Sequence, residues 1–203
     1  IVGDETVLVV DSRFDELLRL DAKTGRLRWR LALGEPVDGA PMIQGNLIFQ
    51  VIPSGKVVVI SLQSGEIQAT IDLGLPLARG PAGDEQGRFL YVIGRHDCLF
   101  VLKPDPLECL AVEYLGHRED SIPCDPLRVG RFLIIPENDR PADSRWRVMV
   151  LDDDGAKPRH VQWINVPGWT WSVPASSGSI IWAAGDTGGL EAYTIGDYAS
   201  KTP

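Results

Sequence analysis

The segment that decides the fold is Leu17-Leu-Arg-Leu-Asp-Ala-Lys-Thr-Gly-Arg-Leu-Arg-Trp29. It opens with the short apolar run Leu17–Leu20, which is typical of a β-strand. The residues Asp21, Thr24 and Gly25 then indicate a tight turn, because glycine readily adopts the positive φ that such a turn needs. The segment therefore predicts two antiparallel strands joined by a hairpin.

Runs of the same kind recur along the chain, and each is closed by Gly, Pro, Asp or Asn. They are Val7–Val10, Leu17–Leu20, Leu47–Val51, Val57–Leu62, Phe89–Ile93, Leu99–Leu102, Phe132–Ile135, Val148–Leu151 and Ile180–Ala183. Almost no stretch has the 3.6-residue apolar period of a helix over a useful length. Evenly spaced strands without intervening helices predict an all-β fold of antiparallel sheets.

The runs also form a repeat. The last strand residue before each turn recurs at intervals of 42, 40, 49 and 42 residues, at Leu20, Leu62, Leu102, Leu151 and Tyr193. A glycine turn follows in three of these units, at Gly25, Gly65 and Gly155. A period near 42 residues with about four strands per unit is typical of β-propeller blades, which stack on one another to bury both faces.

The segment from Asp21 to Trp29 closely resembles the repeat of PQQ-like (quinoprotein-type) β-propellers, in which an Asp-x-x-Thr-Gly turn is followed by Trp. Four residues fall on that pattern, namely Asp21, Thr24, Gly25 and Trp29. The resemblance implies that Trp29 docks one blade against the next. It is sharp only in this unit, because Ala69 stands four residues after Gly65, where the tryptophan is expected.

The spacing of the repeat divides the chain into blades of four antiparallel strands, PQQ-like or WD40-like. We expect one propeller segment over residues 1–203, with partial blades at about 1–37 and 169–203 and full blades at about 38–78, 79–117 and 118–168. PQQ-like propellers have seven or eight blades, so the resemblance implies that the segment is a fragment of a longer protein.

Composition limits the partners and the compartment. The formal net charge of −8 disfavours nucleic-acid binding, because an acidic surface repels phosphate backbones. No apolar run approaches the roughly 18 residues of a transmembrane span. The chain begins Ile1-Val2-Gly3, and we expect its targeting signal to lie elsewhere.

Several side chains could form a site, and each also has a structural interpretation. Trp169 and Trp171 are two residues apart, so on a blade-opening strand both side chains would face the same side of the sheet. There they could form the aromatic base of a ligand site, although such aromatics more often fill the space between blades. His96 with Asp97, and His117 at a blade junction, could supply an acid–base group at the channel mouth. We favour solvated loop pairs for these histidines, since no nucleophile motif accompanies them.

The run from Asp152 to Gly155 has the residues of a calcium loop without its alternating spacing, so we interpret it as a turn. The cysteines Cys98, Cys109 and Cys124 cannot all pair, and Cys98 and Cys109 flank one hairpin, where they could bridge or could be small buried hydrophobes. PQQ-dependent alcohol dehydrogenases carry an adjacent Cys pair, which this sequence lacks.

The resemblance favours a non-catalytic scaffold that binds protein partners and the remaining blades of its parent protein, in a bacterial periplasm or cell envelope. On this reading no cofactor and no metal are expected. One alternative is a fragment of a PQQ-dependent quinoprotein dehydrogenase, which would use PQQ with calcium. A second alternative is a WD40-like cytoplasmic scaffold, although Gly116-His117 has no Trp-Asp partner downstream.

Overall fold

The computed structural model describes residues 5–37, 39–84, 86–152 and 156–196, and all of its regular elements are β-strands. Three sheets have four strands each: β4 (Met42–Gln44), β5 (Leu47–Ile52), β6 (Lys56–Ser61) and β7 (Ile67–Asp72); β8 (Ala82–Gly83), β9 (Leu90–Ile93), β10 (Cys98–Pro104) and β11 (Leu107–Tyr114); and β12 (Leu127–Val129), β13 (Phe132–Glu137), β14 (Asp143–Val150) and β15 (Arg159–Pro167). Two sheets have three strands each within the described residues: β1 (Thr6–Asp11), β2 (Glu16–Asp21) and β3 (Leu27–Ala32), and β16 (Ala175–Ser177), β17 (Ile180–Ala184) and β18 (Leu190–Thr194).

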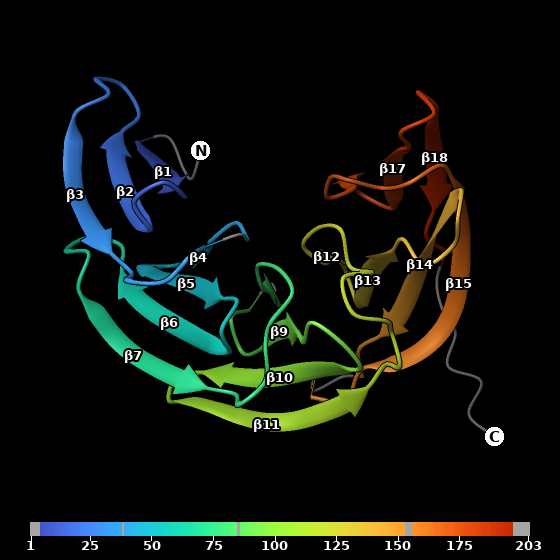
Figure 1. The fold of residues 1–203 in the computed structure, drawn as a ribbon, viewed down its shortest axis with the longest axis horizontal. Helices are drawn as coiled ribbons and strands as arrows, with labels where there is room; N and C mark the ends of the chain where they lie inside the picture. The colour runs from blue at the N-terminus through green and yellow to red at the C-terminus, as the bar shows by residue number, and fades with distance from the viewer. Residues whose placement is uncertain (1–4, 38, 85, 153–155, 197–203) are drawn as a thin grey trace.

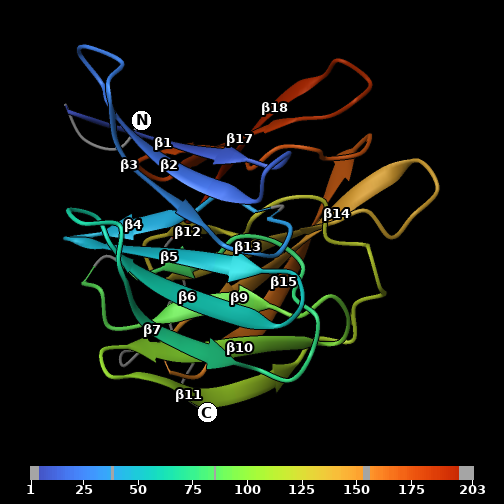
Figure 2. The same cartoon turned by 60° about the vertical axis from the view of Figure 1, so that its left-hand side comes forward.

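The five sheets are the blades of a propeller-type stack, numbered here blade 1 to blade 5 in chain order. They stand side by side in an open arc, with β3, β7, β11 and β15 on its outer perimeter and β4 and β12 toward its centre (Figure 1). Each blade pairs its strands antiparallel in sequence order, and the turned view shows neighbouring blades layered face to face (Figure 2). The predicted all-β fold, with three full and two partial blades, is confirmed.

Alternating side chains bury both faces of each inner strand. In β6, Val57 and Val59 join the apolar cluster between blades 2 and 3, whereas Val58 and Ile60 join the cluster between blades 1 and 2. Successive residues of a strand point to opposite faces, so a strand covered on both sides needs an unbroken apolar run. This explains why the sequence shows runs such as Val57–Leu62 rather than polar–apolar alternation.

A β-bulge recurs at the same place in blades 1 to 4, in the ladder that pairs the last two strands of each blade. It lies at Arg19/Leu20, Val59/Ile60, Val101/Leu102 and Val148/Met149. The residues paired with the first member of each bulge are therefore structurally equivalent, and they are Trp29, Ala69, Ala111 and Gln162. A bulge adds local twist, and its repetition gives these four blades the same twisted outer edge.

The connections between blades approach one another closely at two glycines. A Cβ on Gly39 would lie 2.1 Å from the backbone nitrogen of Gly80, and one on Gly80 would lie 2.3 Å from the carbonyl oxygen of Ala40. No side chain fits such a separation, so glycine is required where the connection from blade 1 to blade 2 meets the connection from blade 2 to blade 3.

Candidate functional site

Trp29 lies between blades 1 and 2. Its indole Nε1 donates a hydrogen bond to the carbonyl oxygen of Leu62 at 2.9 Å, and the ring covers Gly65, where a Cβ would lie 2.7 Å from Trp29 Cδ2. Arg19 Nη1 donates to the same carbonyl at 2.8 Å. The indole thus joins the outer strand of one blade to the turn of the next.

The turn before Trp29 is held by the carboxylate of Asp21. Both the backbone nitrogen and the hydroxyl of Thr24 donate to Asp21 Oδ1 at 2.8 Å, and Arg28 pairs with Oδ2 at 2.5 Å. The hydrogen bond from Arg28 is the largest of the contacts that hold the pKa of Asp21 well below its ordinary value. The equivalent glycine of blade 4, Gly155, lies outside the described residues.

Connecting loops at one end of blades 3 to 5 form a continuous edge, which we call the loop rim: residues 94–97, 115–126, 138–142, 168–174 and 185–189. Hydrogen bonds link each loop to the next, and the link from 138–142 to 168–174 is made by the side chain of Asn138, whose Nδ2 donates to the carbonyl oxygen of Thr170 at 2.8 Å. Asp97 N donates to His117 O at 3.2 Å, Asn138 N donates to Ser121 O at 2.8 Å, and Asp186 N donates to Trp169 O at 3.0 Å. The rim is therefore one hydrogen-bonded surface built from three blades.

Trp169 and Trp171 lie on the loop rim, in the connection from β15 to β16. The prediction that they sit on a blade-opening strand is wrong, because the chain must first cross from the outer edge of blade 4 to the inner edge of blade 5. The rings still meet edge to face, with centroids 5.5 Å apart. Trp169 Nε1 donates to the carbonyl oxygen of Arg140 at 3.0 Å, while Trp171 is 59% exposed.

Thr170 anchors the two tryptophans from between them. Its side chain is buried, and its hydroxyl accepts a hydrogen bond from Trp146 Nε1 at 3.0 Å. Its backbone nitrogen donates to Ser144 Oγ at 2.7 Å, and its carbonyl oxygen accepts from Asn138 Nδ2 at 2.8 Å. A buried polar residue satisfied in this way fixes the backbone of the loop that carries Trp171.

The histidines of the loop rim differ in environment. His96 and Asp97 form an exposed pair in the turn between β9 and β10, with Nδ1 and Oδ2 3.2 Å apart. His117 is buried, contrary to the expectation of a solvated loop, and its Nε2 lies 2.9 Å from the carbonyl oxygen of Gly94. Burial lowers the pKa of His117, so the neutral imidazole donates to that carbonyl.

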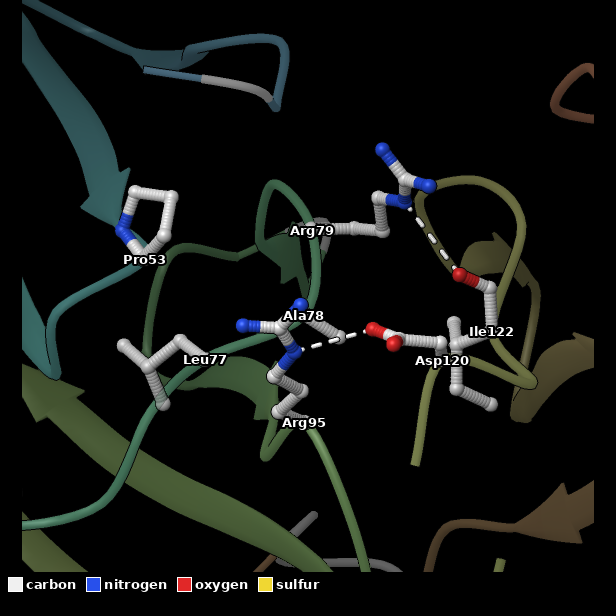
Figure 3. A pocket seen from close by; sticks show the side chains of 7 residues that line it. All are labelled: Pro53, Leu77, Ala78, Arg79, Arg95, Asp120 and Ile122. Carbon is white, nitrogen blue, oxygen red and sulfur yellow. Dashed lines mark hydrogen bonds and ion pairs between the residues drawn. The ribbon is translucent and has the colours of Figure 1, made fainter. Parts of the chain in front are cut away.

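A small pocket of about 120 Å³ opens between the connections of blades 2, 3 and 4 (Figure 3). Arg95 Nε pairs with Asp120 Oδ1 at 2.9 Å across it, and Arg79 Nε donates to the carbonyl oxygen of Ile122 at 3.2 Å. Leu77 and Pro53 supply its apolar wall. The pocket is lined by guanidinium groups that already have partners, which suits a structural bridge between blades.

The sequence analysis missed a polar network in blade 4. Glu137 is fully buried, and its Oε1 accepts from Arg147 Nε at 2.8 Å. Arg145 reaches Asp139 at 2.6 Å, and both arginines lie over the Trp163 ring, with centroid distances of 4.0 and 4.4 Å. The signal was present as Arg-Trp-Arg at residues 145–147, whose alternation places both arginines on one face of a strand.

The cysteines are unbridged. Cys98 and Cys124 are buried, and burial raises the pKa of the Cys124 thiol to about 12. Cys109 is exposed, so the expectation that it is buried is wrong. In the hairpin register Cys98 pairs with Tyr114 and Cys109 with Leu102, which places the two sulfurs at different ends of the ladder.

Among the described residues, no three His, Cys, Asp or Glu side chains are grouped so that they could hold a metal ion. The absence of a cofactor stays a prediction. The described part of the chain also contains no helix long and apolar enough to cross a membrane.

Comparison with known proteins agrees with the repeat. The family model described as "Outer membrane protein assembly factor BamB" matches residues 1–72, and no curated protein sequence matched significantly. The crystal structure of BamB from Moraxella catarrhalis aligns with a TM-score of 0.63 and 16% identity, over 93% of this chain and 54% of that chain. Kuenenia stuttgartiensis hydrazine synthase aligns with a TM-score of 0.71 and 14% identity, over 88% of this chain and 52% of that chain.

These matches confirm the predicted resemblance to PQQ-like propeller repeats. At such identities the solved structures show the fold alone, and the chain spans about half the length of each. One of the two solved structures is BamB, and the other is hydrazine synthase, an enzyme, so the shared fold does not choose between a scaffold and an enzyme.

Proposed function

We propose that this propeller segment is a non-catalytic protein-interaction module of a larger bacterial envelope protein, and that its partner binds the loop rim at Trp171. The observation that carries the proposal is Trp171 itself, an indole 59% exposed on a loop that Thr170 fixes by buried hydrogen bonds. Tryptophan is enriched among residues that dominate binding energy, and a loop that is already fixed loses little backbone entropy on binding.

The exposed face of blade 5 supports a larger parent protein. Ile180, Trp182 and Leu190 are all solvent-exposed there, while Ile181 and Ala183 on the opposite face are buried against blade 4. A sheet with one open apolar face favours a further layer over it. The match of residues 1–72 to the family model described as an outer membrane protein assembly factor supports an envelope location.

The test is site-specific photo-crosslinking in the full-length parent protein, expressed in its bacterial host. A photoreactive phenylalanine analogue replaces Trp171 in one strain and Leu27, an exposed apolar residue at the opposite end of blade 1, in another. The proposal expects a discrete crosslinked protein from position 171 and none from position 27. Equal crosslinking at both positions, or none at either, would contradict it.

A calorimetric titration with PQQ and Ca²⁺, together with a dye-reduction assay, tests the alternative of a quinoprotein dehydrogenase. The proposal expects neither saturable heat nor dye reduction. Saturable binding of PQQ with turnover would contradict the non-catalytic scaffold and favour a quinoprotein dehydrogenase.

A further inference from the structure

The outer strand of blade 3, β11, exposes apolar side chains. Leu110, Val112 and Tyr114 are 41%, 56% and 81% exposed. In the ladder, Val112 and Tyr114 lie opposite two residues of β10 that belong to the apolar cluster between blades 2 and 3, so both lie on the face toward blade 2. Leu110 is the extra residue of the bulge just before them. We call these three residues the apolar row.

The repeated bulge identifies the equivalent residues of the other outer strands. Its extra residue in blades 1, 2 and 3 is Arg28, Gln68 and Leu110. Two residues later these blades have Arg30, Thr70 and Val112. In blade 4 that position is Trp163, and two guanidinium groups lie over its ring. Charged side chains protect an edge strand from pairing with another chain, and β11 is the one of these four strands with exposed apolar side chains at both positions.

The backbone of β11 has an open edge. The strand pairs with β10 on one side and is the last strand of its sheet, on the outer perimeter of the arc (Figure 1). In the part of the chain that the structure describes, no strand pairs with its other side. The N–H and C=O groups of alternate residues in an edge strand point away from the sheet, so β11 can accept a further strand.

The charge around β11 indicates the composition of such a strand. Residues 61–78 and 98–114, which contain the outer strands of blades 2 and 3, include five acidic residues and one basic residue, Lys103. Glu108 is exposed and, within the described ranges, forms no ion pair, even with its cross-strand neighbour Lys103. Glu108 and Val112 lie on opposite faces of β11. A complementary strand therefore alternates apolar and basic residues.

A second copy of this chain fits the open edge less well. Pairing of two β11 strands would bring Glu108 and Glu113 of both copies into one ladder, where like charges on neighbouring strands are destabilising. Each copy also carries a formal net charge of −8, so the copies repel one another. A basic segment of another protein has neither disadvantage.

We propose that the open edge of β11 binds an extended segment of a partner protein, in which apolar residues alternate with lysine or arginine. The segment adds a strand to blade 3, its apolar side chains cover the apolar row, and a basic side chain faces Glu108. This surface is separate from Trp171, which lies in the connection from blade 4 to blade 5, so it does not depend on the function proposed for the loop rim.

The probe is the fluorescein-labelled peptide Lys-Val-Lys-Ile-Lys-Val-Lys, titrated against the full-length parent protein by fluorescence anisotropy. At low salt it should bind at least about tenfold more tightly than the same peptide with glutamate in place of lysine. N-methylation of alternate peptide nitrogens keeps the charge and removes the main-chain donors, and it should weaken binding at least about tenfold. Hydrogen exchange should show new protection of amides in β11 and none in β7.

Val112→Arg gives blade 3 the residue type that blade 1 has at the equivalent position, on an exposed site where it leaves the core intact. It should weaken binding of the lysine peptide at least about tenfold. The matched control Thr70→Arg adds the same charge to the equivalent position of β7 and should change the affinity less than about twofold. Glu108→Lys should remove the preference for lysine over glutamate peptides, and Glu66→Lys should not.

Three results would overturn the proposal: undetectable binding of the lysine peptide, equal effects of Val112→Arg and Thr70→Arg, or tight binding of the N-methylated peptide. A dimer that sedimentation detects in wild type and that Val112→Arg dissociates would assign the edge to a second copy and would also overturn it. The photo-crosslink at Trp171 probes another blade, so its failure and the failure of peptide binding are distinguishable.

Discussion

Blades 1 and 2 are joined in a different way from blades 3 and 4. The first interface has Trp29 across Gly65 with its nitrogen bonded to Leu62, over an apolar cluster that includes Ile48 and Ile60. The second has no tryptophan at the equivalent Ala111, and the buried Glu137–Arg147 pair and buried His117 lie in this part of the molecule. The comparison teaches that one repeat geometry accepts either an aromatic dock or a polar network between its blades.

Trp29→Ala should break the aromatic dock and have the largest effect. We expect a loss of about 2–4 kcal/mol in the free energy of unfolding, because the half-buried indole loses both its packing and its bond to Leu62. Urea unfolding followed by far-UV circular dichroism measures it. The control Trp182→Ala, on the exposed face of blade 5, should cost less than about 1 kcal/mol; an equal loss would mean that Trp29 is not a dock.

Glu137→Gln tests the polar network between blades 3 and 4. Removing the charge leaves the buried Arg147 without its counter-ion and should cost about 1–3 kcal/mol. Glu119→Gln, whose carboxylate is largely exposed beside Arg95, should be nearly neutral. Unfolding curves that coincide for the two variants would show that the buried pair contributes nothing particular to this interface.

Gly65→Ala tests the contact between the Trp29 ring and the turn of blade 2. Its φ of +74° and the 2.7 Å approach of a Cβ to Trp29 predict a loss of about 1–3 kcal/mol. In the Trp29→Ala background the steric part should vanish, leaving about 1 kcal/mol of backbone strain. Strictly additive losses in that double mutant would show that the ring does not lie over the glycine.

The smallest effect is on pH dependence. Burial lowers the pKa of His117, so between its folded pKa and its ordinary value near 6.5 the unfolded chain binds more protons. His117 therefore stabilises the fold fully above about pH 6.5 and loses that contribution as the pH falls from there toward its lowered folded-state pKa. His160, whose pKa burial also lowers, acts in the same direction, while Glu137, whose pKa burial raises, acts in the opposite one.

Melting temperatures at several pH values, for wild type and His117→Gln, check this assignment. The variant should lose part of the acid sensitivity, since an amide can still donate to the Gly94 carbonyl oxygen without titrating. Other charged groups near His117 are Asp97, His96 and Arg147, and they are the same in both proteins. Identical pH profiles of the two proteins would show that His117 does not contribute to the pH dependence of stability.

The fold could be predicted because blades repeat a local pattern. Glycine turns, apolar runs and the 42-residue period are all properties of neighbouring residues, and every predicted run overlaps a strand. The loop rim could be predicted only in part. Trp169 and Trp171 were identified by their spacing, but the strand assignment failed because no local signal shows where the chain leaves one sheet for the next.

Polar contacts between residues far apart in the chain could not be predicted from the sequence. The burial of His117 follows from Gly94, which lies in a different hairpin, and the Glu137–Arg147 pair follows from strand register. Likewise the equivalence of Ala111 and Trp29 becomes visible only when the bulges of the two blades are aligned. Such features depend on which blades meet, and a single sequence gives no direct measure of that.

The most direct test of the account is to move the tryptophan from one interface to the other. Free energies of unfolding would be measured for wild type, Trp29→Ala, Ala111→Trp and the double variant. If the two interfaces share one plan, Ala111→Trp raises stability by about 1 kcal/mol in both backgrounds, because distant sites add independently. If Ala111→Trp lowers stability in both backgrounds, the two positions are not equivalent and the account is wrong.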